Sequence, residues 1–362
     1  MLYTALAGGL TGLLFGFVLQ RGRFCMTSAF RDLYLTRDSR LFKAYVVSLA
    51  VQSTGILLLQ QAGLVQVQPD PFQWLAALTG GLIFGISVIL SGGCASGTYF
   101  RIGEGMVGSL VAAVFYGIGA LMARAGALAP LTRRIQEPTA TLNGATTLYG
   151  ALGVSPWVLA GALWAVSLFF LVRSRREPQP AIPFPEDPHR PALWRAVFGR
   201  GWSWPVTGFA VGAVAVLAWI TSVSTGRHYG LGITTPTANL LRFLVVDSNP
   251  QFLDWGVFLV LGIPLGSYLA ARGAGEFRLR APNAGRLLQH MVGGLGMGLG
   301  ATLARGCNVG NGLVAVSLFT LNGWVATLAI ILGTWVGAYL FLVLPMRAQV
   351  RAAGQAVAAS GG

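Results

Sequence analysis

Long apolar segments follow one another along nearly the whole chain, and they constrain its fold more than any other feature. Windows of about 20 apolar residues recur through the 362 residues, and a helix of that length crosses about 30 Å of hydrocarbon. Because a backbone in lipid must satisfy its own N–H and C=O groups, these windows predict helices. With 54% hydrophobic and only 10% charged residues, no sizeable soluble domain remains. The sequence predicts an all-α integral membrane protein.

The hydropathy pattern separates long segments from short ones. Nine membrane-spanning helices are predicted, over residues 2–20, 41–61, 74–90, 105–124, 156–172, 202–223, 252–271, 287–303 and 323–344. Four shorter segments, over residues 26–35, 95–102, 235–246 and 308–319, cannot span. We predict that they are re-entrant half-helices, short helices that enter the membrane part of the way. Such backbone is tolerated only where protein or a water-filled cavity surrounds it.

The net charge of +14 predicts orientation rather than a nucleic-acid partner, because the basic residues sit in short loops between spans. With the N-terminus outside, 19 of the 25 lysines and arginines fall on the inner side. We therefore expect a periplasmic N-terminus and a cytoplasmic C-terminus. The first segment lacks a basic start and a small-residue cleavage site, so a retained span is expected rather than a signal peptide.

An internal duplication gives the order of these segments a meaning. "GGLIFGISVILSGGCASG" from Gly80 aligns with "GGLGMGLGATLARGCNVG" from Gly293, with eight of 18 positions identical, including the cysteine. "GLLFG" at Gly12 likewise lies 13 residues before a cysteine. "GFAVG" at Gly208 is a weaker fourth copy, with Thr221 in the place of the cysteine.

Four spans, one extra span and four more place the second copy in the membrane with opposite polarity. In transporters built from such inverted repeats, sites lie near the midplane where broken helices meet. The predicted organisation is a first membrane half over residues 1–172, a proline-rich cytoplasmic linker over 173–200, a second half over 201–346 and a cytoplasmic tail over 347–362.

The three cysteines of the chain, Cys25, Cys94 and Cys307, each follow a glycine-patterned span and precede a half-helix. Glycine lets the chain leave a helix and brings backbone close to a ligand. A half-helix that begins just after the thiol directs free N–H groups and a positive dipole end at it. A single cysteine of this kind is more often a packing residue, but three in repeated positions favour an anion-attracting pathway.

The residues that flank the cysteines are further candidates. The polar candidates are Gln20, Arg23, Ser91, Ser96, Arg305, Asn308 and Asn311, and the predicted structural turns are Gly22, Gly92, Gly93, Gly97, Gly306 and Gly310. Polar groups at membrane depth usually face the bundle interior. Arg305 needs an anionic partner, which the sequence leaves open between a substrate, Glu104 and Asp254.

Motifs of soluble enzymes are missing from the sequence. It contains no Walker loop, no G-x-S-x-G and no H-E-x-x-H. No histidine or acid recurs at ligand spacing beside the cysteines, so neither a metal, another cofactor nor a catalytic constellation is predicted.

The segments "GLLFGFVLQRGRFC", "GGLIFGISVILSGGCASG" and "GGLGMGLGATLARGCNVGNGL" resemble the YeeE/YedE family of bacterial inner-membrane sulfur-transport proteins. The resemblance implies an hourglass-shaped bundle and thiosulfate uptake across the inner membrane. It also implies that Cys25, Cys94 and Cys307 relay the ion through transient S–H···S hydrogen bonds, and that a TusA-like sulfur carrier or a rhodanese is a possible cytoplasmic partner.

Three alternatives stay open at this stage. The substrate can be another sulfur or selenium oxyanion. The protein can be a membrane sulfurtransferase that passes sulfane sulfur to a cytoplasmic acceptor, with one cysteine as a persulfide carrier. It can also be a purely structural subunit.

Overall fold

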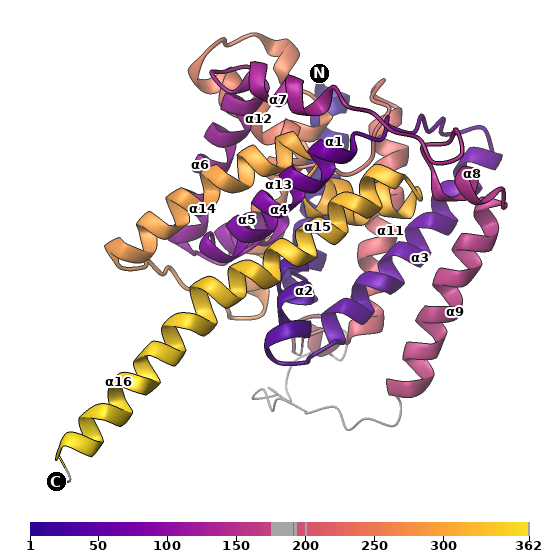
Figure 1. Ribbon diagram of the computed structural model, residues 1–362. Helices are drawn as coiled ribbons and strands as arrows, with labels where there is room; N and C mark the ends of the chain where they lie inside the picture. The colour runs from indigo at the N-terminus through magenta and orange to yellow at the C-terminus, as the bar shows by residue number, and fades with distance from the viewer. Residues whose placement is uncertain (175–190, 192–193, 200, 361–362) are drawn as a thin grey trace.

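The computed structural model describes residues 1–174, 191, 194–199 and 201–360, and this part of the chain folds into helices without a β-strand. The predicted all-α architecture is confirmed. In Figure 1 the helices form one bundle, with the N-terminus at its upper end and the C-terminal helix extending away from it. Most of the predicted linker, residues 175–190, 192–193 and 200, lies outside the described residues.

Nine long helices lie where the nine spans are predicted. They are α1 (Leu2–Arg21), α3 (Arg40–Gln61), α4 (Trp74–Leu90), α6 (Val107–Arg124), α9 (Pro156–Ser174), α11 (Trp204–Val223), α13 (Trp255–Gly273), α14 (Ala284–Leu303) and α15 (Leu321–Ala338). The predicted boundaries differ from these by a few residues.

Eight segments of the described chain are long and apolar enough to cross a membrane, and α14 is not one of them. This helix has 20 residues, but Arg286, His290 and several glycines lower its hydropathy. It packs against α4 and α6. The eighth predicted span, residues 287–303, is therefore a long helix whose composition alone does not mark it as membrane-spanning.

Four short helices occupy the positions of the predicted half-helices. They are α2 (Met26–Leu35), α5 (Ala95–Gly103), α12 (Thr234–Val245) and η3 (Asn308–Ala315), the last of which is a π-helix. The remaining elements are α7 (Ala129–Gln136), α8 (Leu148–Leu152), η1 (Arg195–Gly199), η2 (Pro250–Phe252), η4 (Tyr339–Val343) and α16 (Leu344–Ser360). The segment predicted as a tail thus belongs to α16, which continues α15 through the π-helical turn η4.

Helix packing follows the symmetry that the duplication predicts. If α1, α3, α4 and α6 are equated with α11, α13, α14 and α15, the contact of α1 with α13 corresponds to that of α11 with α3. The contact of α4 with α15 corresponds in the same way to that of α14 with α6. The short helices obey the same rule, because α5 packs on α13 as η3 packs on α3. The two halves therefore interlock rather than form separate domains.

The extra helix α9 lies at the edge of the bundle, where it packs against α3 (Figure 1). Only 11% of its apolar window is buried within the protein. A helix that is apolar on all sides and little buried suits contact with lipid. In the predicted organisation it is the extra span of the first half.

Glycines set the distance between the most closely packed helices. On α1, Gly8, Gly12 and Gly16 recur every four residues, and a Cβ on each would overlap a backbone carbonyl oxygen of α13. The opposite side of α1 exposes Leu6, Leu10 and Leu14. Small residues at such spacing let helix backbones touch in a membrane.

This packing predicts opposite outcomes for two glycines of α1. Gly16→Ala should place a methyl group on the Ile263 carbonyl oxygen and destabilise the fold by roughly 1–3 kcal/mol, the usual cost of overpacking. Gly9→Ala is the matched control, because no atom lies within 4 Å of its added Cβ. Thermal unfolding in detergent measures both. Equal melting temperatures for the two variants would contradict the assigned crossing.

Candidate substrate pathway

The short helices begin at the candidate residues of the sequence. The residue that precedes the first turn is Cys25 in α2, Cys94 in α5, Ile233 in α12 and Cys307 in η3. The weak fourth copy was therefore placed wrongly, because Thr221 lies within α11 and its hydroxyl bonds to Thr11. The half-helix of that copy begins only at Thr234, after a longer connection.

Cys25 and Cys94 form a buried pair of thiols. Their Sγ atoms lie 3.8 Å apart, the separation of an S–H···S hydrogen bond rather than a disulfide. The backbone N–H of Gly97 donates to the Cys94 Sγ at 3.4 Å, and the Ser96 Oγ lies at the same distance from it. The start of α5 thus presents donors to sulfur, as the dipole argument predicts.

Gly97 makes the thiol pair possible. A Cβ on this residue would lie 2.8 Å from the Cys25 Sγ and 3.4 Å from the Cys94 Sγ, well inside van der Waals contact for the first. Gly97 has no left-handed backbone angle, so its role is to leave space rather than to turn the chain.

Cys307 lies fully buried at the start of η3, in the second half of the chain. Its thiol interacts with the Tyr116 hydroxyl, which bonds to the Thr234 hydroxyl at 2.8 Å. Tyr99 bonds to Thr237 of the same short helix at 2.9 Å. Two tyrosines of the first half therefore connect the start of α12 with Cys307 and with the α5 helix.

The three turns before the cysteines share one backbone feature. The second residue before each cysteine is left-handed: Arg23 at φ 49°, Gly92 at φ 76° and Arg305 at φ 61°. Gly22 is right-handed at φ −78°, so the predicted turn glycine is not the residue that turns the chain there. A non-glycine residue in this conformation costs about 1–2 kcal/mol, so Arg23 and Arg305 each end a long helix at an energetic cost.

The other predicted turn glycines act through close approach. A Cβ on Gly22 would meet the Thr207 side chain, one on Gly93 the Arg101 guanidinium and one on Gly306 the Asn311 backbone N. Gly310 is different, because its nearest neighbour, the Tyr229 hydroxyl, lies 3.6 Å away.

The polar candidates divide into two groups. Ser91 donates to the Gly93 carbonyl at 2.8 Å, and Asn311 donates to those of Gly306 and Ala304, so both stabilise the turns. Asn308 is 1% exposed, and neither its side-chain O nor its N has a partner. Thr27 and Thr98 also carry buried, unbonded hydroxyls. These unmatched groups beside the cysteines suit a polar guest.

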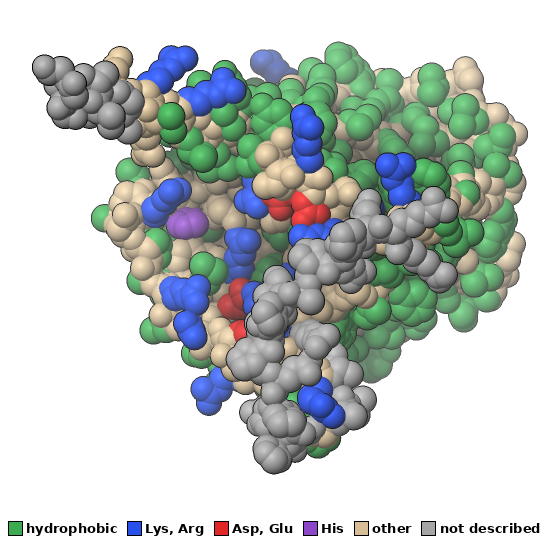
Figure 2. Space-filling view, turned by 90° about the horizontal axis from the view of Figure 1, so that it is seen from below, with side chains coloured by type: hydrophobic (Ala, Val, Ile, Leu, Met, Phe, Trp, Pro, Cys, Tyr) green, Lys and Arg blue, Asp and Glu red, His purple; other side chains and the backbone are tan. Residues whose placement is uncertain are grey.

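One end of this region carries a charged cluster, which we call the Glu104 face. Arg23 donates to Glu104 and to Glu276, each at 2.7 Å. Gln20 donates to the same two carboxylates, at 3.3 and 2.6 Å. Figure 2 looks at the bundle from below and shows acidic side chains among basic ones, bordered by hydrophobic surface.

Burial raises the pKa of Glu104, and the neighbouring charge of Arg23 opposes that rise. The Glu104 side chain is 12% exposed and that of Arg23 is 51% exposed. The ionised form of Glu104, which is largely buried, is therefore stabilised by Arg23 more than the half-exposed guanidinium of Arg23 is stabilised by Glu104.

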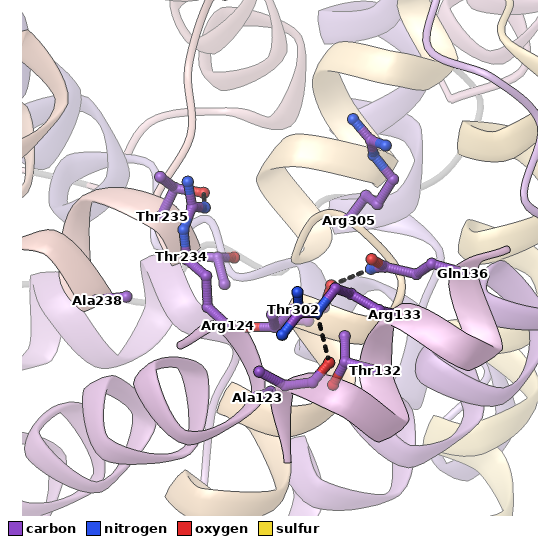
Figure 3. Close-up of a pocket in the computed structure, with 12 residues that line it drawn as sticks. Ala123, Arg124, Thr132, Arg133, Gln136, Thr234, Thr235, Ala238, Thr302 and Arg305 are labelled. Carbon is purple, nitrogen blue, oxygen red and sulfur yellow. Dashed lines mark hydrogen bonds between the residues drawn. The ribbon is translucent and has the colours of Figure 1, made fainter. Parts of the chain in front are cut away.

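The opposite end, the Arg305 face, holds two neighbouring cavities of about 360 and 240 Å³. Figure 3 shows Arg124, Arg133 and Arg305 around the larger one, with Gln136 bonded to the Thr302 carbonyl. The smaller cavity adds Arg227 and Tyr229. Burial lowers the pKa of Arg227, and Asp254 opposes that change. The guanidinium groups that line these cavities suit oxyanions, because each presents several N–H donors in one plane.

Arg305 finds an acidic partner that the sequence analysis missed. It pairs with Asp70 at 2.9 Å, and neither Glu104 nor Asp254 occupies that position. Asp70, Glu276, Tyr116 and Thr234 lie far from the cysteine motifs in sequence, so no spacing pointed to them. Only the run "TTPT" at the start of a predicted half-helix carried a signal.

The thiol pair generates a prediction about Gly97. Gly97→Ala should separate Cys25 from Cys94, so that a mild oxidant joins the two cysteines far more slowly than in the wild type. Peptide mass spectrometry after oxidation measures the disulfide. Gly310→Ala is the matched control, since Gly310 holds the same place after Cys307 and has room for a methyl group. Fast oxidation of the Gly97 variant would contradict the assigned role.

Comparison with known proteins identifies the family of this chain. A family model described as Sulphur transport matches residues 21–336. Thiosulfate transporter TsuA of Escherichia coli (strain K12) is 40% identical over 94% of this chain and 96% of its own length. Thiosulfate transporter TsuA of Spirochaeta thermophila is 38% identical over 94% and 99%. Probable transporter YedE of Escherichia coli is 39% identical over 27% of the chain and 24% of its own length. All three relatives are named as transporters, which agrees with a chain that is not an enzyme; it is a multi-pass membrane protein and belongs to the sulphur transport family.

Proposed function

We propose that the protein carries thiosulfate across the bacterial inner membrane, from the Arg305 face to the Glu104 face. The near full-length similarity to two thiosulfate transporters supports the substrate. The observation that carries the pathway is the buried Cys25–Cys94 thiol pair at 3.8 Å. On the orientation that the charge distribution favours, the Arg305 face is periplasmic and the Glu104 face cytoplasmic.

Thiosulfate has two chemically different ends, and the proposed path offers a partner for each. Its oxygens carry most of the hydrogen-bond accepting power and suit the guanidinium groups of Arg124, Arg227 and Arg305. Its terminal sulfur is soft and polarizable, and a neutral thiol is a weak donor that matches it. The two ends of the ion are thereby recognised separately.

Weak contacts in series suit conduction better than one tight site. An ion must bind well enough to leave water and loosely enough to move on. Cys307 is the first thiol behind the arginines, and the Cys25–Cys94 pair is the second station. A passing sulfur can accept from one thiol while the other still bonds within the pair.

Polar groups between the stations lower the cost of burying a dianion. Asn308, Thr27 and Thr98 have unmatched polar atoms in this region. A carboxamide and two hydroxyls can donate to the oxygens of the ion without adding fixed charge. An ion in transit then exchanges water for side-chain donors rather than losing hydrogen bonds.

A cytoplasmic sulfur carrier of the TusA type or a rhodanese remains a prediction. Such a partner would consume the delivered ion at the Glu104 face and keep its internal concentration low. Consumption of this kind supplies a direction of transport without ATP hydrolysis by this chain.

A sulfurtransferase is the second candidate, and the closeness of Cys25 and Cys94 favours it over the others. A thiolate that attacks the outer sulfur of thiosulfate forms a persulfide and releases sulfite, and a neighbouring thiol can then receive the sulfur. Under the transport proposal, purified protein exposed to thiosulfate keeps all three cysteines unmodified. A stable cysteine persulfide, seen by mass spectrometry, would favour the enzyme.

The transport proposal predicts the effect of removing the paired thiol. Cys94→Ala should abolish uptake of labelled thiosulfate into proteoliposomes, because the ion loses its sulfur-selective station, while melting temperature changes little. Cys94→Ser keeps a donor of similar shape but not the soft sulfur, so it should retain folding and lose most uptake.

Thr221→Ala serves as the control, since Thr221 lies in α11 and bonds to Thr11, away from the thiols. Normal uptake by the Cys94→Ala protein would remove the pathway from consideration.

A further inference from the structure

Two arginines in equivalent turns stand at the two ends of the proposed path, and both are held by carboxylates from distant segments. Arg23 and Arg305 each lie two residues before a cysteine, and each has a left-handed backbone. Arg305 bonds to Asp70, and Arg23 bonds to Glu104 and Glu276. The third equivalent position is Gly92, which carries no charge.

We propose that these arginines are anion gates latched by carboxylates, and that thiosulfate opens each gate by taking the place of a carboxylate on the guanidinium. The inference rests on the proposed transport of thiosulfate and names the residues that control entry and exit. Asp70 is the outer latch. Glu104 and Glu276 form the inner latch.

Geometry supports exchange at the outer latch. Arg305 lines both cavities of the Arg305 face, whereas Asp70 lines only the smaller one, which also contains Gly306 and Gly310 of the Cys307 turn. A guanidinium that swings between an acid and the cavity therefore controls the space next to the thiol. Asp70 and Arg305 are 40% and 37% exposed, so the released carboxylate is solvated at little cost.

The inner latch is built more tightly. Arg23 lies in the turn between α1 and α2. It bonds to Glu104, the residue after α5, and to Glu276, in the loop after α13, so it joins the two halves of the chain. Gln20 donates to both acids, and Arg21, which is 1% exposed, contacts Glu276 at 3.4 Å. Loss of one carboxylate leaves Arg23 held by the other.

This difference gives the two gates different roles. The outer latch has one half-exposed acid and opens readily to an anion, whereas the inner latch has two less exposed acids with further partners. An ion that passes Arg305 is thus held at the thiols until it displaces Glu104 and Glu276 from Arg23. The carboxylates also keep both ends from binding any small anion that arrives, because each anion must displace an acid.

Thiol labelling tests the outer latch independently of transport. In a Cys25→Ser/Cys94→Ser background, Cys307 is the remaining thiol, and it reacts with an anionic sulfonatoethyl or a neutral methyl methanethiosulfonate. Asp70→Asn should raise the rate with the anionic reagent by about two- to fivefold, the range for an exposed ion pair, and leave the neutral rate unchanged.

Two matched variants sharpen this test. Asp38→Asn removes an acid that pairs with Arg40 at 2.6 Å, away from both cavities, and should change neither rate. Arg305→Gln should abolish the effect of Asp70→Asn, because the two residues act as one unit. An unchanged or slower anionic rate in Asp70→Asn, or equal acceleration of both reagents, would overturn the outer latch.

The inner latch is tested at Cys25 in a Cys94→Ser/Cys307→Ser background. Glu104→Gln and Glu276→Gln should each change the rate of labelling by the anionic reagent by less than twofold. The double variant should accelerate this labelling by more than the product of the two single factors. Melting temperatures identify any variant that fails to fold. Full acceleration by one substitution, or none by a folded double variant, would overturn the inner latch.

The outcome is separable from that of the proposed function. Wild-type protein that takes up no labelled thiosulfate contradicts the transport proposal, whereas the charge-selective labelling rates judge the latches alone.

Discussion

The N–H groups at the start of each short helix, which have no acceptor within their own helix, are the constraint on which the rest of this structure depends. Four helices begin inside the bundle, at Cys25, Cys94, Ile233 and Cys307, where lipid offers no partner. They can exist only because long helices enclose them, and those helices approach closely because glycines line their contacts. The same N–H groups then make the interior attractive to anions. Packing and anion affinity thus have one origin.

Symmetry explains why the site has parts of two kinds. The duplication produces four half-helix starts. Three of them carry a thiol and the fourth does not. At the fourth, Thr234 and Thr237 bond to Tyr116 and Tyr99, so hydroxyls stand where sulfur might be expected. The proposed path therefore alternates soft and hard donors, which fits an ion with a soft sulfur at one end and oxygens at the other.

The sequence predicted the parts of the fold that periodicity and repetition encode. Hydropathy located the nine long helices, and the cysteine repeat located the turns and three of the half-helix starts. Hydropathy placed the fourth half-helix within one residue of α12, but the alignment by "GFAVG" put the equivalent of the cysteine at Thr221, inside α11, because the connection before α12 is longer than in the other copies. Partners that meet only in three dimensions, such as Asp70 with Arg305 or Glu276 with Arg23, had no sequence signal. The contact of Cys25 with Cys94 belongs to the same group, because the repeat marked both cysteines as candidates but not their proximity.

A path lined only by arginines would hold a dianion rather than pass it on. The fixed dipoles of the half-helices and the guanidinium groups all favour negative charge, and in a site that excludes water such attraction is strong. Carboxylates at both ends reduce it, because they occupy the arginines whenever the ion does not. The ion thus exchanges one set of contacts for another of similar energy at each step. In the proposed pathway, near-equal energies along the way, rather than tight binding at one site, allow the ion to move through a buried interior.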